Sequence, residues 1–212
     1  AHCWVRNVRM INAEGGIFLR GVHCTVREIV LETDKKSVVK RYYQANQPCH
    51  GHHGISVYGA DNLVTDFDIR MCYVHDLSLE GYVAGGNVFS KGRGNDLCFD
   101  FHKRAANANL LTQIDCGHGG RIWRHGGGRN LGKPIAGWNT FWRITAENPM
   151  SAPPKELAPW TLNIIGMKTR QETNTSSGQR WFEAIDPTKL EPTNLYIAQR
   201  DKRLGKIETA KK

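Results

Sequence analysis

Histidine is frequent in this sequence, and its histidines are grouped. There are nine among 212 residues, and three of them crowd into CHGHHG (49–54). His75 stands beside Asp76, and His102 follows Asp100 by two positions. Imidazole changes its charge near neutral pH, so a histidine next to a carboxylate suits proton transfer. The sequence therefore offers candidates for acid–base chemistry.

An alignment of short strands by their inward residues brings several of these groups together. The inward residues share matching positions in three segments: Ile55 and Val57, Leu77 and Leu79, Leu97 and Phe99. Tyr58, Glu80 and Asp100 then form one outward column, and His102 follows one outward step later. Carboxylates on adjacent turns stand roughly 5 Å apart and push each other's pKa values apart. We therefore predict an acid–base site here, with ordinary outward polar residues as the competing interpretation.

We predict two groups of residues at such a site, one for catalysis and one for substrate binding. The candidate catalytic residues are His102, Asp100, Glu80, Arg104 and Arg121. The candidate substrate-binding residues are Trp123, Tyr58, His125, Trp138 and His75. Tryptophan is included because indole faces stack on sugar rings, although burial in the core is the competing account.

The histidines of CHGHHG could instead bind a metal ion. No carboxylate stands at a fixed spacing from them, and no CxxC pair occurs to support a structural zinc site. We predict no metal ligand and no cofactor, and leave calcium open.

An apolar spacing that recurs along the chain predicts the elements that position these residues. Val5, Val8 and Met10 of CWVRNVRMI return as Val26, Ile29 and Leu31 of CTVREIVLE. The same steps of three and then two occur in NLVTDFDI, CYVHDLSL, NLLTQIDC, TFWRITA and WTLNIIGM. They fit neither an uninterrupted strand nor a helix, but two short strands joined by a tight bend satisfy them.

A second set of short strands alternates with the first. Its members are GISVYG (54–59), LSLEG (77–81), LCFDF (97–101) and RIWRH (121–125). The segments recur roughly every 20 to 25 residues, which is about one turn of a β-solenoid, and Gly and Asn stand at the corners. We therefore predict an all-β solenoid, with a β-sandwich of coincidental spacing as the alternative.

The length predicts one domain with three parts. Residues 1–192 are the β turns, 34–53 a protruding loop, and 193–212 a short helix with a basic tail. The helix is expected over 195–204, capped at Thr193 or Asn194 and lying over the last turn. The first strand begins without a polar cap, so we expect earlier turns and an export signal upstream.

The charge balance points to a polyanionic partner. The net charge is +9 and the pI is near 9.4, so nucleic acid and acidic polysaccharide are the candidate partners, with solubility as the plain alternative. No zinc-finger spacing, aromatic RNA-binding strand or basic heptad helix occurs, so we predict no nucleic acid. No apolar stretch approaches the roughly 20 residues of a membrane span.

Three of the six cysteines share one position in the repeat. Cys3, Cys24 and Cys72 each stand two residues before an inward valine, so stacked turns would bring them to strand separation. A disulfide and a ladder of packed thiols both fit this spacing, and we favour packed thiols.

The repeats, the asparagine-led strands NLVTDFDI and NLLTQIDC, and GNVFSKGRGNDLCFDFHKRA (86–105) resemble the right-handed parallel β-helix proteins of the pectin-lyase-like superfamily. Residues 62–148 with the ending WFEAIDPTKLEPTNLYIAQRDKRL are similar to an uncharacterised bacterial group of such proteins. The resemblance implies a right-handed parallel β-helix that acts on polysaccharides outside the cytoplasm. Because β-helix families place different residues on one scaffold, it assigns no residue roles.

Three functions are compatible with these observations. The leading one is a secreted or periplasmic lyase that cleaves a uronic-acid polysaccharide, with His102 as the base and Arg104 or Arg121 neutralising the carboxylate. The second is a glycoside hydrolase that uses Glu80 and Asp100. The third is a non-catalytic module that binds glycan or serves as a structural spike.

Overall fold

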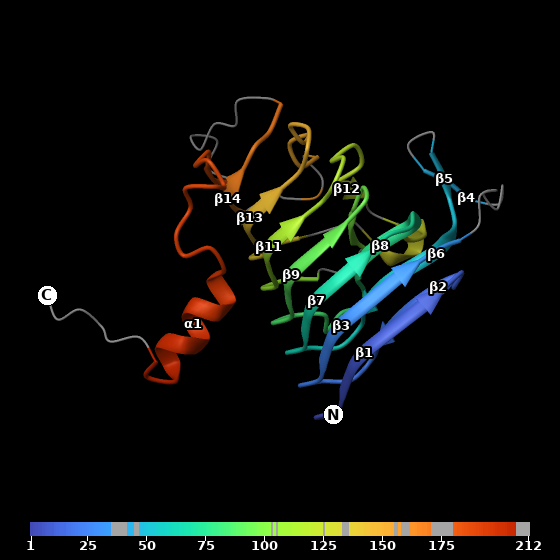
Figure 1. Cartoon of the computed structure of the whole chain (residues 1–212), viewed down its shortest axis with the longest axis horizontal. Helices are drawn as coiled ribbons and strands as arrows, with labels where there is room; N and C mark the ends of the chain where they lie inside the picture. Colours follow the sequence, from blue (N-terminus) through green and yellow to red (C-terminus); the bar gives the residue numbers. More distant parts are fainter. Residues whose placement is uncertain are drawn as a thin grey trace, which may run out of the picture.

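A computed structural model describes residues 1–34, 42–44, 47–102, 104, 106–124, 126–132, 136–154, 157, 162–170 and 180–206. Eight strands form a parallel sheet, named sheet A here. Their order is β1 (Trp4–Ile11), β3 (Thr25–Glu32), β7 (Leu63–Ile69), β9 (Val88–Gly94), β11 (Leu110–Asp115), β13 (Thr140–Thr145), β14 (Leu162–Met167) and β15 (Arg180–Glu183). Figure 1 shows most of these strands side by side in chain order.

Five further strands form a second parallel sheet, named sheet B. Their order is β12 (Trp123–Arg124), β10 (Phe99–Phe101), β8 (Tyr73–Leu79), β6 (Gly51–Val57) and β2 (Gly15–Leu19). From β1 to β13, successive strands belong alternately to sheet A and sheet B, so each turn of the chain adds one strand to each sheet. The exception is a small two-stranded ribbon described below. The prediction of stacked parallel strands is thus confirmed, and the sandwich alternative, which requires antiparallel sheets, is wrong.

The predicted bend lies in the middle of the sheet A strands. Asn7, Glu28, Asp66, Gln113 and Arg143 have φ between 55° and 58°, in the left-handed region, and each stands between two inward apolar positions. Such a residue reverses the side to which the next side chain points, which produces the steps of three and two. CYVHDLSL has the same spacing but lies in sheet B as β8.

Apolar side chains of neighbouring turns stack in register between the sheets. Val5 pairs with Val26 and Leu111 with Phe141, as the repeat predicts. Val64, Leu111 and Phe141 are at most 1% exposed, so the stacked positions of the inner strands form the core, whereas Val5 in the edge strand β1 is 40% exposed.

A ladder of buried asparagines holds one corner of the stack. Nδ2 of Asn87 donates to Oδ1 of Asn109, and Nδ2 of Asn109 donates to Oδ1 of Asn139, at 3.0 and 2.9 Å. Each amide also donates to a carbonyl in an earlier turn, such as the Asn87 amide to Gly59 at 2.9 Å. Asn62 extends the ladder by one turn. The amides satisfy buried corner groups that no strand pairing reaches.

The predicted C-terminal helix is present, but its position differs from the prediction. Helix α1 (Leu195–Arg203) is capped by Asn194, whose side chain accepts from the amide of Ile197. Nδ2 of Asn194 donates to Ser90 of β9 at 2.9 Å, and the amide of Leu195 donates to Thr112 of β11. The start of α1 therefore contacts the middle strands of sheet A (Figure 1), and the expectation that the helix lies over the last turn is wrong.

The predicted protruding loop at 34–53 lies partly outside the described residues. Two short strands within it, β4 (Tyr42–Gln44) and β5 (Gln47–Cys49), pair as an antiparallel ribbon. Strand β6 begins at Gly51, so His52 and His53 belong to sheet B and not to a loop. A 3-10 helix, η1, covers Arg129–Leu131.

The cysteines follow the repeat only in part. Thr25 donates to the carbonyl of Cys3, so Cys3 and Cys24 do lie in adjacent turns. Cys72 instead precedes β8 of sheet B, where its Sγ lies 2.7 Å from Sγ of Cys49. The prediction that Cys72 shares the frame of Cys3 and Cys24 is wrong, because the shared spacing occurs in both sheets.

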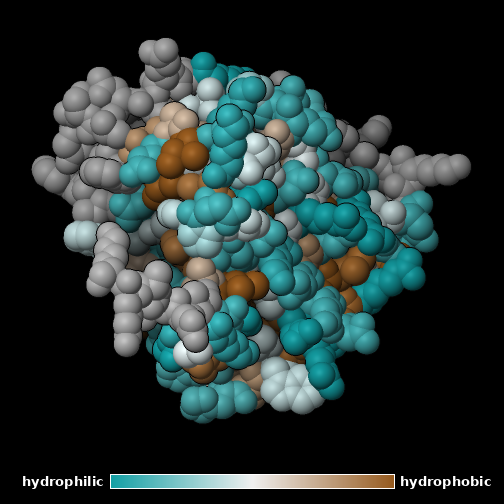
Figure 2. All heavy atoms as spheres, turned by 60° about the vertical axis from the view of Figure 1, so that its left-hand side comes forward, coloured by the Kyte–Doolittle hydropathy of each residue, from teal (hydrophilic) through white to brown (hydrophobic). Residues whose placement is uncertain are grey.

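The molecular face in Figure 2 is mainly hydrophilic, with hydrophobic residues in separate patches. Among the described residues, no helix combines the length and the apolar character that a membrane span needs.

Candidate functional site

The pairing of β6 with β8 is as the sequence alignment predicts, with Ile55 opposite Leu77 and Val57 opposite Leu79, but β10 is shifted by two residues. Phe99 pairs with Leu77, and Asp100 with Ser78. Leu97 and Cys98 precede β10, so Leu97 does not take the position that was predicted for it. The amide of His102 donates to Leu79, and Glu80 donates in the same way to Val57 of the turn before. The outward column is therefore Tyr58, Glu80 and His102, while Asp100 stands one step earlier with Ser78 and Ser56.

This register gathers what we call the histidine cluster: His53, His75, His102, Glu80 and Asp100. Their side chains are 16%, 8%, 19%, 9% and 0% exposed, in that order. His53 pairs with His75 across β6 and β8, and their ring centroids lie 5.1 Å apart. The ring of His102 lies 5.5 Å from that of His75. Three imidazoles and two carboxylates thus share one largely water-excluded site.

Asp100 is the centre of the cluster. Nδ1 of His102 donates to its Oδ2 at 2.8 Å, and Nδ1 of His75 lies 3.2 Å from the same oxygen. Ser78 Oγ donates to Oδ2 at 3.2 Å, and the amide of Gly126 donates to Oδ1 at 2.6 Å. Burial raises the pKa of Asp100, but the hydrogen bond from His102 and the charges of both histidines outweigh it and lower the pKa overall. Asp100 is therefore a buried anion that orients imidazoles.

The backbone of Gly126 packs directly against the cluster. A Cβ on this residue would stand 2.7 Å from Cε1 of His75 and 2.7 Å from Cε1 of His102. Any other residue would have to displace these rings, so the glycine lets the backbone approach the imidazoles and donate to Asp100.

The histidines differ in protonation. Burial lowers the pKa of His75 to about 4, and it also lowers that of His53. The hydrogen bond to Asp100 raises the pKa of His102 despite partial burial. Neutral His53 and His75 therefore have a nitrogen lone pair, which a proton or a metal ion could occupy.

Glu80 joins the cluster to Tyr58. Oε1 of Glu80 lies 3.7 Å from Nδ1 of His53, and this buried oxygen has no hydrogen-bond partner among the described residues. Burial, followed by the charge and hydrogen bond of Glu80, raises the pKa of Tyr58 to about 12. Tyr58 therefore keeps its phenolic proton.

Of the two predicted arginines, only Arg104 lies near the cluster. Its charge lowers the pKa of His102, and its guanidinium lies over the ring of Tyr82, 5.0 Å from the centroid. Arg121 is 5% exposed, forms an ion pair with Asp76, and donates to the carbonyl of Tyr73 at 2.8 Å. The prediction that Arg121 grips substrate is wrong, because its guanidinium is committed to the interior.

The predicted aromatic residues have different environments. Trp123 is half-buried against Phe141, with ring centroids 5.0 Å apart, and its Nε1 donates to Ser151 at 2.6 Å. It packs against the core and is not an open sugar platform. Trp138 is 66% exposed. His125 lies outside the described residues.

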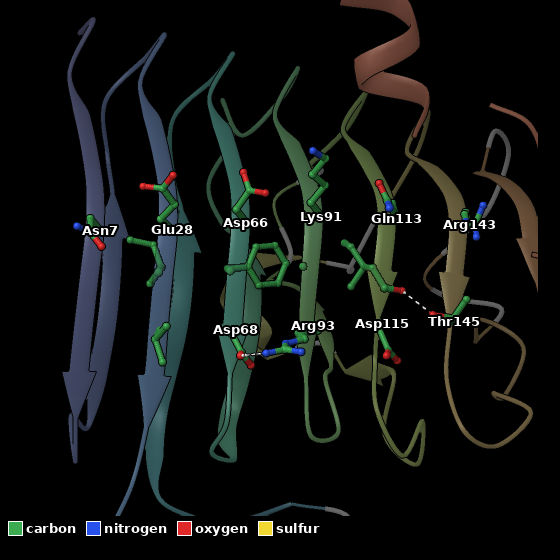
Figure 3. Close-up of a pocket in the computed structure, with 15 residues that line it drawn as sticks. Asn7, Glu28, Asp66, Asp68, Lys91, Arg93, Gln113, Asp115, Arg143 and Thr145 are labelled. Carbon is green, nitrogen blue, oxygen red and sulfur yellow. Dashed lines mark hydrogen bonds and ion pairs between the residues drawn. The ribbon is translucent and has the colours of Figure 1, made fainter. Parts of the chain in front are cut away.

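A groove on sheet A, which the sequence did not indicate, is a second candidate site. Figure 3 shows one side chain from each of six neighbouring strands in a row: Asn7, Glu28, Asp66, Lys91, Gln113 and Arg143. A second row contains Asp68, Arg93, Asp115 and Thr145, with Arg93 donating to Asp68 at 2.7 Å. The cavity measures 660 Å³. It contains no imidazole, so we place the chemistry at the histidine cluster although the cluster is less open.

Sequence reasoning missed three contributors to the site. His53 was noticed but assigned to the loop, because the start of β6 has no alternating pattern. Gly126 stands in the glycine-rich segment GGGRNLGKPIAGW, which lacks the apolar spacing of the repeat. Tyr82 is 74% exposed beside Arg104, and its place in EGYVAGG after a strand was an available signal.

Comparison of the chain with protein-family models, with curated proteins and with solved structures gives no match.

Proposed function

We propose that this chain is a secreted enzyme that cleaves an acidic polysaccharide by β-elimination, with the reacting sugar bound at the histidine cluster. The observation that carries the proposal is the hydrogen bond from His102 to the buried carboxylate of Asp100, at 2.8 Å, beside a second imidazole and the carboxylate of Glu80. A carboxylate that orients an imidazole at a water-poor site is an arrangement suited to proton transfer.

The reaction needs a base at C5 of the uronic acid, a donor for the leaving oxygen and a cation for the carboxylate. The half-buried imidazoles of His102 and His53 are the candidate bases. As the base removes the proton, its electron pair forms the C4–C5 double bond and the glycosidic oxygen leaves C4. Tyr58 keeps its phenolic proton and is the candidate donor to that oxygen. Arg104 is the candidate cation.

Hydrolysis by Glu80 and Asp100 is less well supported. A glycosidase needs both carboxyl groups at the scissile bond, one of them protonated when the reaction begins. The Asp100 side chain is fully buried and its pKa is lowered, so it neither reaches substrate nor supplies a proton. This favours elimination over hydrolysis.

The proposed scaffold is a right-handed parallel β-helix of the pectin-lyase-like kind. Its support is the alternation of the chain between two parallel sheets and the asparagine ladder at one corner. The net charge of +9 supports an acidic substrate.

A second candidate is glycan binding without catalysis, along the groove of sheet A. Its support is the row of polar side chains that repeats at strand spacing, about 4.8 Å, which is close to the length of one sugar unit. The groove contains acidic residues (Glu28, Asp66, Asp68 and Asp115) as well as basic ones (Lys91, Arg93 and Arg143), so it suits a polar chain of mixed character better than a uniform polyanion.

The test is a panel of acidic and neutral polysaccharides incubated with the full chain. Ultraviolet absorbance of the unsaturated product together with new reducing ends identifies a lyase. Reducing ends without that absorbance identify a hydrolase and refute elimination. Binding with neither product refutes the enzyme and supports a glycan-binding module.

A further inference from the structure

We propose that His75, Asp100 and His102 form a binding site for one divalent transition-metal ion of the zinc or iron(II) class. The ligand atoms of these three residues all lie within 4.8 Å of one another. The strands β8 and β10 and the residue that follows β10 supply them, so a rigid parallel sheet fixes their positions.

The distances around Asp100 are close to those in a metal centre. Nitrogen and oxygen ligands bind zinc at about 2.0–2.2 Å, so two ligand atoms of one tetrahedral ion lie about 3.4 Å apart. Oδ2 of Asp100 lies 2.8 Å from Nδ1 of His102 and 3.2 Å from Nδ1 of His75. Two of the three separations are thus near the required size, and a small rotation of the rings admits the ion.

The buried nitrogen of His75 provides an independent observation. Its side chain is 8% exposed, and Nδ1 has no hydrogen-bond partner among the described residues, although it stands 3.2 Å from Asp100. A buried polar atom that lacks a hydrogen-bond partner is costly. A cation bound to both this nitrogen and Oδ2 of Asp100 would satisfy both atoms.

The donor set selects the class of metal. Imidazole nitrogen suits zinc, copper, iron and nickel, and two histidines with one carboxylate leave further positions open for water or substrate. Calcium prefers six to eight oxygen ligands, which this cluster does not supply. The sequence-based expectation of no metal ligand is therefore revised for this cluster, and calcium is not the ion we propose here.

The ion also has a place in the proposed enzyme, and this part of the inference rests on the proposed function. Beside Arg104, it supplies the second positive charge at a uronic-acid carboxylate that Arg121 does not provide. Because His102 then serves as a ligand, removal of the C5 proton falls to His53, whose Nδ1 lies near Glu80.

Metal binding is tested without substrate. The full chain is stripped with EDTA and titrated with Zn²⁺ by calorimetry, bound metal is counted by mass spectrometry, and Co²⁺ is added separately to record its visible absorption. We expect one tightly bound ion per chain and cobalt bands typical of nitrogen and oxygen ligands. His75→Ala and His102→Gln should each weaken Zn²⁺ binding by at least about 10–100-fold. Mutation of a residue that only hydrogen-bonds to a metal ligand already lowers metal affinity by that much. His102→Gln is included because the His102 side chain is more exposed than that of His75, at 19% against 8%, so this variant should fold even where His75→Ala does not.

The matched control is His23→Ala. His23 is exposed and stacks on His2 with ring centroids 5.2 Å apart, so this pair is another place where Zn²⁺ could bind. Unchanged binding in His23→Ala supports the buried site, and loss of binding there overturns it. Equal binding by wild type and His102→Gln also overturns it, as does a wild type that binds no metal. A chain that binds Zn²⁺ but cleaves no polysaccharide refutes the proposed enzyme and leaves the metal site standing.

Discussion

Asp100 of β10 pairs with Ser78 of β8, and this register places His102 next to Glu80. The carboxylate of Asp100 is thereby left beneath the imidazoles, where it orients them instead of facing substrate. The two-residue difference between the expected and the observed register therefore decides that Asp100 has a supporting role in the proposed chemistry.

Replacement of His102 tests the cluster as the site of reaction. His102→Ala should lower the rate on the best polysaccharide about 10²–10⁴-fold, the usual share of a positioned proton-transfer group. The loss of one hydrogen bond to Asp100 should cost about 1–2 kcal/mol of unfolding free energy. Initial rates and urea denaturation measure the two effects. His118→Ala, at an exposed histidine outside the cluster, should change neither quantity. Intact turnover in His102→Ala would show that the cluster is not the site of reaction.

Arg121 is expected to matter for stability. Arg121→Met leaves Asp76 buried without its cation and should lower the unfolding free energy by about 3–5 kcal/mol, as measured by urea denaturation. Arg124→Met, at an exposed arginine three residues later, should cost less than about 0.5 kcal/mol. If both variants unfold at the same urea concentration, the buried ion pair does not contribute as described.

Cys49 and Cys72 are expected to form a disulfide under mild oxidation. Their sulfur atoms lie 2.7 Å apart, and the hydrogen bond from Cys72 lowers the pKa of Cys49, which favours the attacking thiolate. Oxidised glutathione should give a crosslink between their peptides in a mass spectrum under non-reducing conditions. The 23-residue separation predicts a stabilisation of about 3 kcal/mol. Cys72→Ser should remove both effects. A crosslink that instead joins Cys3 and Cys24 would contradict this pairing.

Trp138 is the candidate for sugar stacking. Trp138→Ala should weaken glycan binding about 2–10-fold, the range of one aromatic contact, with little change in melting temperature because the ring is 66% exposed. Trp4 is also 66% exposed, but it lies in β1 at the edge of sheet A, so Trp4→Ala is a matched control. Calorimetric titration with oligosaccharides compares the variants. Equal losses in both would point to a general effect of surface aromatic residues.

The sequence by itself determined the turns of this protein. The steps of three and two around Val26, Ile29 and Leu31 predicted inward positions and a bend between them, and the structure has both. This was possible because burial of apolar groups and the left-handed bend are properties of single turns, which nearby residues specify. The C-terminal helix was predictable for the same reason, since Asn194 caps it locally.

Only the tertiary structure decided how one turn lies on the next. The position at which each strand begins after its corner decides three features of the site. These are the register of β10 on β8, the burial of Arg121 against Asp76, and the pairing of His53 with His75. All inward positions of a strand are apolar, and side chains alternate with a period of two. A register shift by two residues therefore keeps every apolar side chain inside, and the sequence of a single strand does not reveal it. Packing, hydrogen bonds at the corners and the pairing of buried charges select among these registers, and they join residues that are 22 or more positions apart.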